Sequence, residues 1–133
     1  MALDASEAVS EYTGPLLHIC SRAEWEAARA AGELRAPSLA EVGFIHLSAP
    51  RQVHLPADRL FAGRRDLVLL WLDPARLTDP VRWEPGVPTD PESMRFPHLY
   101  GPLPVAAVIE VTEFRPGPDG RFVPVELPRG DLT

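Results

Sequence analysis

The sequence contains no lysine and no asparagine, so all 13 of its cationic side chains are arginines. A lysine nucleophile, a Schiff-base lysine and the lysine of a phosphate-binding loop are therefore excluded. The single cysteine, Cys20, excludes an intramolecular disulfide framework and a zinc site built from several cysteines. A formal net charge of −6 argues against a nucleic-acid surface dominated by phosphate contacts.

Long apolar runs are missing as well. The longest, residues 67–72, is far too short to span a membrane. Residues 1–14 carry neither the positive segment nor the apolar segment of a secretory signal, so we expect a cytoplasmic protein with no membrane partner.

The sequence has 133 residues, of which 45% are hydrophobic and 24% charged, which is typical of one globular domain. We expect a disordered lead over residues 1–14, a single domain over residues 15–128 and a tail over residues 129–133. The 16 prolines are spread along the chain, which indicates short, stiff connections rather than low complexity.

Strand-like segments outnumber helices. The expected strands are residues 15–20, 43–48, 67–73, 81–84, 105–114 and 121–125, with a proline-rich loop over residues 85–104. Ser21 and Glu24 form a capping-box pattern that predicts a helix over residues 22–31, ending at Gly32. A second such pattern, Ser38 with Glu41, opens a single turn, and residues 50–62 read as helical turns. The predicted class is α+β with a mostly antiparallel sheet.

Three of the four histidines, His18, His46 and His98, lie in or just after apolar, strand-like runs. A buried imidazole needs polar partners for its ring nitrogens. These residues are therefore either hydrogen-bonded core histidines or members of one polar cleft, and the pattern leaves both interpretations open. His54 lies in a polar helical segment and reads as a surface residue.

Strand alternation places Phe44, His46 and Ser48 on one face, so an imidazole and a hydroxyl can lie side by side. Ser48 is equally well interpreted as a helix N-cap, and no Gly-x-Ser-x-Gly pattern supports a serine nucleophile.

Glu84 ends a strand-like run just before a Pro-Gly turn, where it is either a site carboxylate or the partner of an arginine. Residues 95–101 bring together Arg95, Phe96, His98 and Tyr100, a combination that suits a binding loop or a rigid aromatic anchor. The three histidines and Glu84 could also supply metal ligands. Their spacing matches no compact metal-binding motif, so we predict no metal site.

These strings together resemble one known family. Leu16-Leu17-His18-Ile19, Trp25, the segment 43–48 (Gly-Phe-Ile-His-Leu-Ser) and the segment 96–101 (Phe-Pro-His-Leu-Tyr-Gly) resemble the family called domain of unknown function 952, over residues 15–124. That family commonly carries a cysteine where this chain has Leu47, so a thiol at that position is not required here.

The family is in turn similar to the ADP-ribosyltransferase fold, a split and strongly bent β-sheet that holds NAD in a cleft. The resemblance implies catalytic roles for His18, His46, Glu84 and His98. Glu84 would stabilise an oxocarbenium-like state, and His98 would act as an acid or base. The implied substrate-binding residues are Ser48, Arg51, Arg95, Phe96 and Tyr100, with an arginine on the pyrophosphate.

The expected function is an enzyme that acts on NAD or a related nucleotide or phosphoribosyl compound, cleaving or transferring at the N-glycosidic (ribosyl) bond. NAD would be a substrate and no cofactor is expected, and without a Gly-x-Gly-x-x-Gly pattern the site would not be of the Rossmann kind. One alternative is a non-catalytic module that binds a small anion or a nucleotide. Another is a structural protein whose histidines only satisfy the core.

Overall fold

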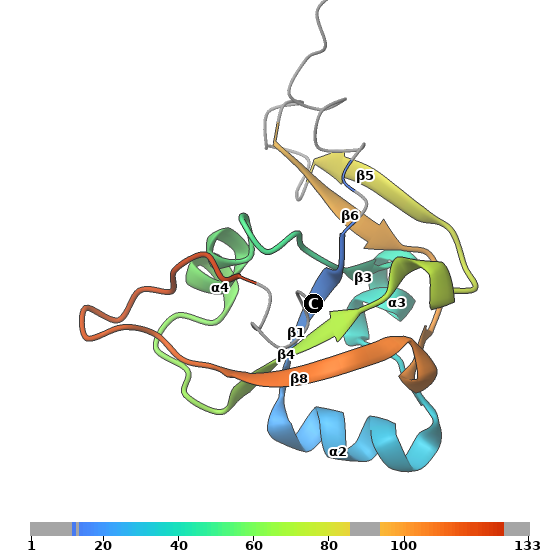
Figure 1. Ribbon diagram of the computed structural model, residues 1–133, viewed down its shortest axis with the longest axis horizontal. Coiled ribbons are helices and arrows are strands. Elements are labelled where there is room, and N and C mark those ends of the chain that lie inside the picture. Colours follow the sequence, from blue (N-terminus) through green and yellow to red (C-terminus); the bar gives the residue numbers. More distant parts are fainter. Residues whose placement is uncertain (1–11, 13, 86–93, 127–133) are drawn as a thin grey trace, which may run out of the picture.

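The computed structural model of the chain describes residues 12, 14–85 and 94–126, and its strands form three antiparallel groups (Figure 1). The first sheet has the order β1 (Leu16–Ser21), β4 (Leu67–Leu72) and β8 (Val108–Phe114). The second has the order β3 (Ile45–His46), β6 (Arg95–Leu99) and β5 (Val81–Pro85). A short pair joins β2 (Glu33–Leu34) to β7 (Leu103–Pro104). The predicted α+β class with antiparallel sheets is confirmed.

The helices lie around these sheets. They are α2 (Arg22–Ala31), α3 (Pro37–Val42) and α4 (His54–Leu60), with 3₁₀ turns at Pro74–Arg76 and Val105–Ala107. Among the described residues, no helix is long and apolar enough to cross a membrane. The predicted lead over residues 1–14 and tail over residues 129–133 fall almost entirely outside the described residues.

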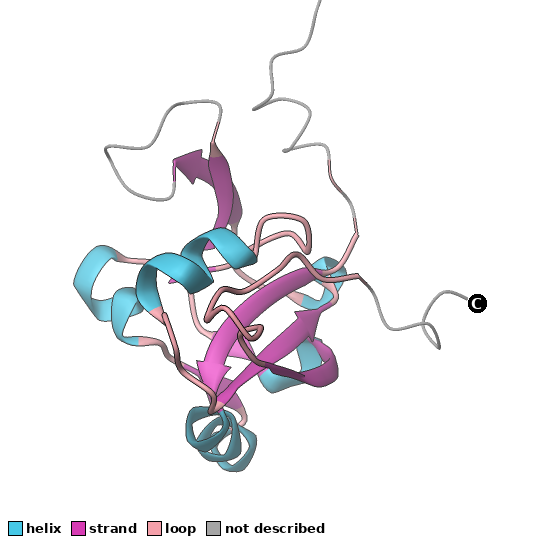
Figure 2. Cartoon of the chain, turned by 90° about the vertical axis from the view of Figure 1, so that its left-hand side faces the viewer, coloured by secondary structure: helices cyan, strands magenta, loops and turns pink. Residues whose placement is uncertain are grey.

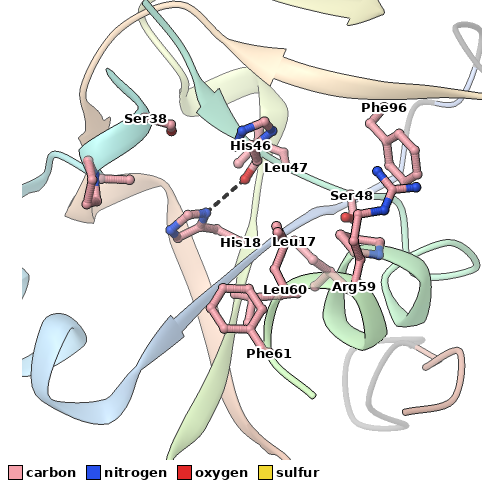
Figure 3. A pocket seen from close by; sticks show the side chains of 14 residues that line it. Leu17, His18, Ser38, His46, Leu47, Ser48, Arg59, Leu60, Phe61 and Phe96 are labelled. Atoms are coloured by element: carbon pink, nitrogen blue, oxygen red, sulfur yellow. Dashed lines mark hydrogen bonds between the residues drawn. The ribbon is translucent and has the colours of Figure 1, made fainter. Parts of the chain in front are cut away.

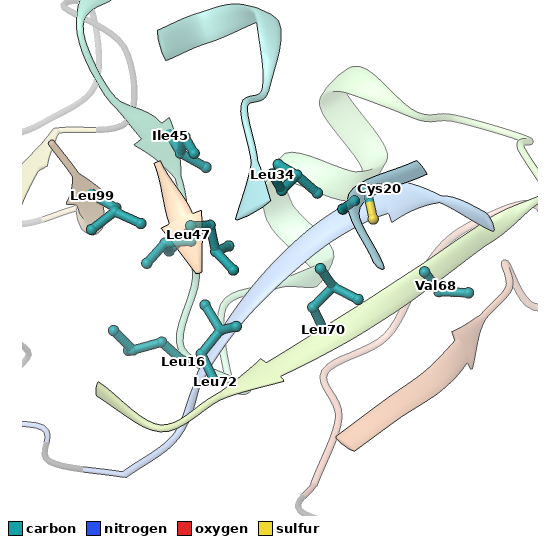
Figure 4. Packing of buried hydrophobic residues seen from close by; sticks show 11 residues of the cluster. Leu16, Cys20, Leu34, Ile45, Leu47, Val68, Leu70, Leu72 and Leu99 are labelled. Atoms are coloured by element: carbon teal, nitrogen blue, oxygen red, sulfur yellow. The ribbon is translucent and has the colours of Figure 1, made fainter. Parts of the chain in front are cut away.

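Strand β4 is apolar throughout because both of its faces are buried. Val68, Leu70 and Leu72 point into one hydrophobic cluster, which also holds Leu16 and Cys20 of β1 (Figure 4). The alternate residues of β4 point into a second cluster on the opposite face, together with Phe114 and Phe122. The first sheet is therefore the middle layer of the molecule.

Helix α2 begins and ends as the sequence predicts. The Glu24 backbone N–H donates to Ser21 Oγ at 3.0 Å, and the Ser21 N–H donates to Glu24 Oε1 at 2.8 Å. Gly32 ends the helix with φ of 88°, a left-handed conformation that favours glycine. Local side-chain chemistry therefore fixes both ends of this helix.

Removing the Ser21 hydroxyl is expected to lower the free energy of unfolding by about 1 kcal/mol, because the Glu24 N–H loses its partner. Urea denaturation of Ser21→Ala measures this loss. Ser21→Thr keeps a capping hydroxyl and is expected to retain most of the stability. Equal destabilisation by both substitutions would contradict a capping role.

The second capping box is not formed. Helix α3 begins two residues earlier than this pattern predicts, at Pro37, with Ala36 as an N-cap that makes no side-chain bond. Ser38 therefore lies inside the first turn, and its hydroxyl donates instead to the Phe44 carbonyl at 2.7 Å.

The predicted proline-rich loop over residues 85–104 is wrong in its second half, which contains strands β6 and β7, and residues 86–93 lie outside the described residues. Pro97 lies within β6, the central strand of its sheet, although proline is normally confined to edge strands. Its carbonyl still accepts from the Leu47 N–H at 2.9 Å, so the strand lacks one donor and keeps its other pairing.

Two predicted strands are shorter or absent. The 43–48 strand is reduced to Ile45–His46, and the 105–114 strand begins at Val108 after a 3₁₀ turn. Residues 121–125 form no strand, because after the turn at Gly120 they lie against the α4 region. There the Phe122 N–H donates to Asp58 Oδ1 at 2.9 Å.

The two three-stranded sheets meet at one backbone contact. Leu17 of β1 and Ser48, just beyond β3, exchange two N–H to carbonyl hydrogen bonds of 2.7 and 2.8 Å. The hairpin of β5 and β6 extends away from the first sheet, as Figures 1 and 2 show. The segment around Ser48 therefore belongs to both sheets and sets the junction between them.

Candidate functional site

A pocket of about 280 Å³ lies at the junction of the two sheets (Figure 3). Its walls come from β1, the start of α3, the segment 46–48, α4 and β6. They are mostly apolar, with a few polar side chains gathered among them. The polar lining residues are His18, Ser38, His46, Ser48 and Arg59.

His18 presents one fixed tautomer to this pocket. Its Nδ1 lies 2.9 Å from the His46 carbonyl oxygen. Because a carbonyl only accepts, Nδ1 carries the proton and Nε2 carries a lone pair when the ring is neutral. Burial lowers the pKa of His18, although the bond to His46 opposes this shift. At neutral pH His18 is therefore a hydrogen-bond acceptor through Nε2.

His46 is the exposed imidazole of the pocket. Its ring lies beside the stacked rings of Phe44 and His98. The centroid of the His46 ring is 5.1 Å from that of Phe44 and 5.3 Å from that of His98. Desolvation lowers the pKa of His46, and the nearby imidazoles of His98 and His18 lower it further. This places a neutral, solvent-accessible imidazole beside the fixed His18 ring.

Glu84, His98 and Tyr100 form a hydrogen-bonded cluster next to the pocket. His98 Nδ1 lies 2.9 Å from Glu84 Oε1, and the Tyr100 hydroxyl donates to the same oxygen at 2.6 Å. Phe44 stacks on His98 with ring centroids 3.9 Å apart, so His98 is only 1% exposed. Neither Glu84 nor His98 lines the pocket itself.

Charges inside this cluster are set by its hydrogen bonds. Desolvation raises the pKa of Glu84, but the bonds from Tyr100 and His98 outweigh it, so the pKa lies below the ordinary glutamate value. Desolvation lowers the pKa of His98, and Glu84 opposes that shift. The pair at neutral pH is thus an ionised carboxylate bonded to a neutral imidazole.

The residues predicted from the sequence separate into three groups. His18, His46, Ser48 and Phe96 line the pocket. Glu84, His98 and Tyr100 form the adjoining cluster.

The two predicted arginines form the third group, since neither lines the pocket. Arg51 is exposed, and the Arg95 guanidinium donates to the Trp83 carbonyl at 3.2 Å.

Ser48 is buried and is not a helix cap, because α4 begins after Val53.

Sequence reasoning missed Arg59 and Ser38 as lining residues. Arg59 could have been found, because Pro56, Arg59 and Leu60 are spaced as one face of a helix. Within the described ranges, no group of three or more histidine, cysteine, aspartate or glutamate side chains is placed to hold a metal ion.

The fold and the site define an α+β protein with an imidazole-bearing pocket between two antiparallel sheets. The sequence matches the family described as protein of unknown function (DUF952) over residues 19–111. The chain belongs to this family, so the resemblance drawn from its motifs is confirmed.

Solved structures of one relative support the same fold. The crystal structure of protein CC0527 from Caulobacter crescentus is 39% identical, with a TM-score of 0.68, and the match covers 81% of this chain and 92% of that chain. Its solution NMR structure is 38% identical, with a TM-score of 0.67, covering 83% and 90%. No curated protein matches the sequence.

Proposed function

We propose that the pocket binds a nucleotide or phosphoribosyl compound and that the protein cleaves or transfers at its ribosyl N-glycosidic bond. The observation that carries this proposal is the pair of imidazoles, His18 and His46, in one pocket with Arg59. Pockets with apolar walls and a few convergent polar groups are the usual form of small-molecule sites.

We also propose that the fold is of the ADP-ribosyltransferase type. Two three-stranded antiparallel sheets whose backbones are joined by a short bridge between Leu17 and Ser48 correspond to a split, bent sheet. The pocket lies at that split, where the nucleotide cleft of such a fold is expected. This likeness supports the choice of ligand class but does not establish activity.

The pocket walls suit a ligand with a planar base and an anionic group. Phe61, Phe96 and Leu17 offer apolar surface against which a base can lie. His18 Nε2 accepts a hydrogen bond, so it fits a ribose hydroxyl or an N–H of the base. The Arg59 guanidinium is the lining cation and fits a phosphate.

His46 is the residue placed to transfer a proton. In the proposed reaction the bond from the ribosyl carbon to the base nitrogen breaks, and its electron pair stays on the nitrogen. A water or acceptor hydroxyl then bonds to that carbon and gives up its proton. Because its pKa is lowered, His46 is a neutral imidazole that can receive the proton of the nucleophile.

Ligand binding tests the first part of this proposal. We expect ADP-ribose and NAD to raise the midpoint of thermal unfolding, and calorimetric titration to give a defined Kd. Arg59→Gln and His46→Gln are each expected to weaken binding about tenfold or more, because a charged or polar contact is lost. Arg51→Gln is the matched control, since Arg51 is exposed and outside the pocket. No stabilisation of the native chain by ADP-ribose, NAD or ribose 5-phosphate would overturn the proposal.

A second candidate function is binding without turnover. None of the described pocket-lining residues is a carboxylate, so a positively charged ribosyl intermediate has no direct counter-charge there. Incubation with NAD followed by chromatography of the released base separates the two functions. Binding without any released base would favour the module that only holds a small anion or nucleotide.

A further inference from the structure

We infer that Glu84 and His98 are positioning residues that act on the pocket through His46. Their hydrogen-bonded pair presents an acceptor edge to His46 and stabilises the protonated form of that ring. The inference deepens the proposed function, because it assigns the Glu84 cluster a part in the proton transfer made by His46.

The strand order of the second sheet carries this inference. Strand β6 lies between β3 and β5, and His98 of β6 pairs in register with His46 of β3. Glu84 lies on β5, on the other side of β6. Because His98 Nδ1 bonds to Glu84, the opposite edge of the five-membered ring, which carries Nε2, faces the His46 side.

His98 Nε2 is an acceptor without a partner. It is buried, and it makes no hydrogen bond with the part of the chain that the structure describes. Since the Glu84 carboxylate fixes the proton on Nδ1, Nε2 holds the lone pair when His98 is neutral. Buried polar atoms are almost always paired, so an unpaired one at a candidate site needs an explanation.

His46 is a neighbouring group that is suited to become that partner. The two imidazoles are perpendicular, at 89°, with centroids 5.3 Å apart. His46 is exposed, so its ring has room to turn, whereas His98 is held by Glu84 and by the stacked Phe44 ring. A rotation of His46 that brings one N–H toward Nε2 would satisfy the buried acceptor.

In this arrangement the transferred proton is held by His46 alone. When His46 receives a proton from a pocket ligand, one of its two N–H groups donates to His98 Nε2. The Nδ1 proton of His98 stays in place and Glu84 stays ionised, so its negative charge lies behind the imidazolium. When His46 returns the proton it keeps one N–H, and no proton moves through the Glu84–His98 pair.

Charged and titratable groups on the neighbouring elements also determine the pKa of His46. His98 on β6 and His18 on β1 both oppose its protonation. Arg59 on α4 lines the same pocket. Arg82 lies over the Tyr100 ring at 5.1 Å, and its charge stabilises the ionised Glu84 carboxylate and offsets the field of that carboxylate at His46. Glu84 is the group in the neighbouring cluster that favours a cation on His46.

NMR titration of the His46 imidazole in the ligand-free, full chain tests the inference. Glu84→Gln keeps an acceptor for His98 Nδ1 but removes the charge. We expect the pKa of His46 to fall by about 0.5 unit or more. Tyr100→Phe is the matched control, because it removes one hydrogen bond to Glu84 and leaves the carboxylate charged. An unchanged His46 pKa in folded Glu84→Gln would overturn the inference.

If Glu84→Gln does not fold, the same titration of His46 in Arg82→Gln is a second test. Arg82 is exposed, and its removal leaves the Glu84 charge uncompensated, so the net field at His46 becomes more negative and the His46 pKa is expected to rise. A fall or no change in the His46 pKa would count against the inference. Since both titrations need no ligand, they separate this inference from the proposed function: failure of NAD and ADP-ribose to bind overturns only the latter. If turnover is found, the pH-profile limb governed by His46 is expected to move with its pKa.

Discussion

Trp71→Ala is expected to lower the free energy of unfolding by about 3–5 kcal/mol, the usual cost of removing a large aromatic ring from a core. Trp71 is 1% exposed and lies on β4, the central strand of the first sheet. Its ring contributes to the cluster between that sheet and the α4 region. Truncation therefore leaves a cavity between β4 and α4, and both elements lose packing contacts there.

Thr112→Val separates the hydrogen bond of Trp71 from its packing. The indole N–H donates to Thr112 Oγ1 at 2.9 Å, so valine leaves this donor without its acceptor while conserving volume. We expect a smaller loss, about 1–3 kcal/mol. Urea or thermal denaturation of both variants measures the difference. A loss from Trp71→Ala no larger than that from Thr112→Val would show that packing of this ring contributes little.

Stability is expected to fall as the pH is lowered below about 6.5, the pKa of an unfolded histidine. Burial lowers the pKa of both His18 and His98 in the folded protein. Below pH 6.5 these two histidines therefore bind protons in the unfolded chain but not in the folded chain. Each of these two groups can contribute a slope of about 1.4 kcal/mol per pH unit until its folded-state pKa is reached.

Denaturation curves at pH 7.5, 6.5 and 5.5 measure this slope. The pKa of Glu84 is also lowered, but its contribution is lost only below about pH 4.5, so it falls in a separate window. His98→Gln removes one titrating group and is expected to give a shallower slope than the native chain. Constant stability from pH 7.5 to 5.5 would contradict the burial of neutral imidazoles.

Local patterns in the sequence predict some elements well. The ends of α2 follow from Ser21, Glu24 and Gly32, whose contacts span only a few residues. The apolar run of β4 identifies a buried strand because no side chain in it needs water. In contrast, β6 was hidden by Pro97, since proline argues against a central strand unless the position needs no donor.

The candidate site depends on contacts that no local pattern contains. The bond from His18 to the His46 carbonyl links residues 28 positions apart, and it exists only because the two sheets meet there. The family motifs did better: the Gly-Phe-Ile-His and Phe-Pro-His strings turn out to lie on neighbouring strands, with His46 and His98 in register. What they could not predict is that His98 faces Glu84 behind the pocket.

At Ser48 the backbone and the side chain have different roles. Its two hydrogen bonds with Leu17 use only backbone atoms, while its side chain lines the pocket. Any residue with a backbone N–H can form these two bonds, so the junction itself does not require the Ser48 hydroxyl. A substitution at position 48 is thus expected to alter the pocket wall while the two sheets stay joined.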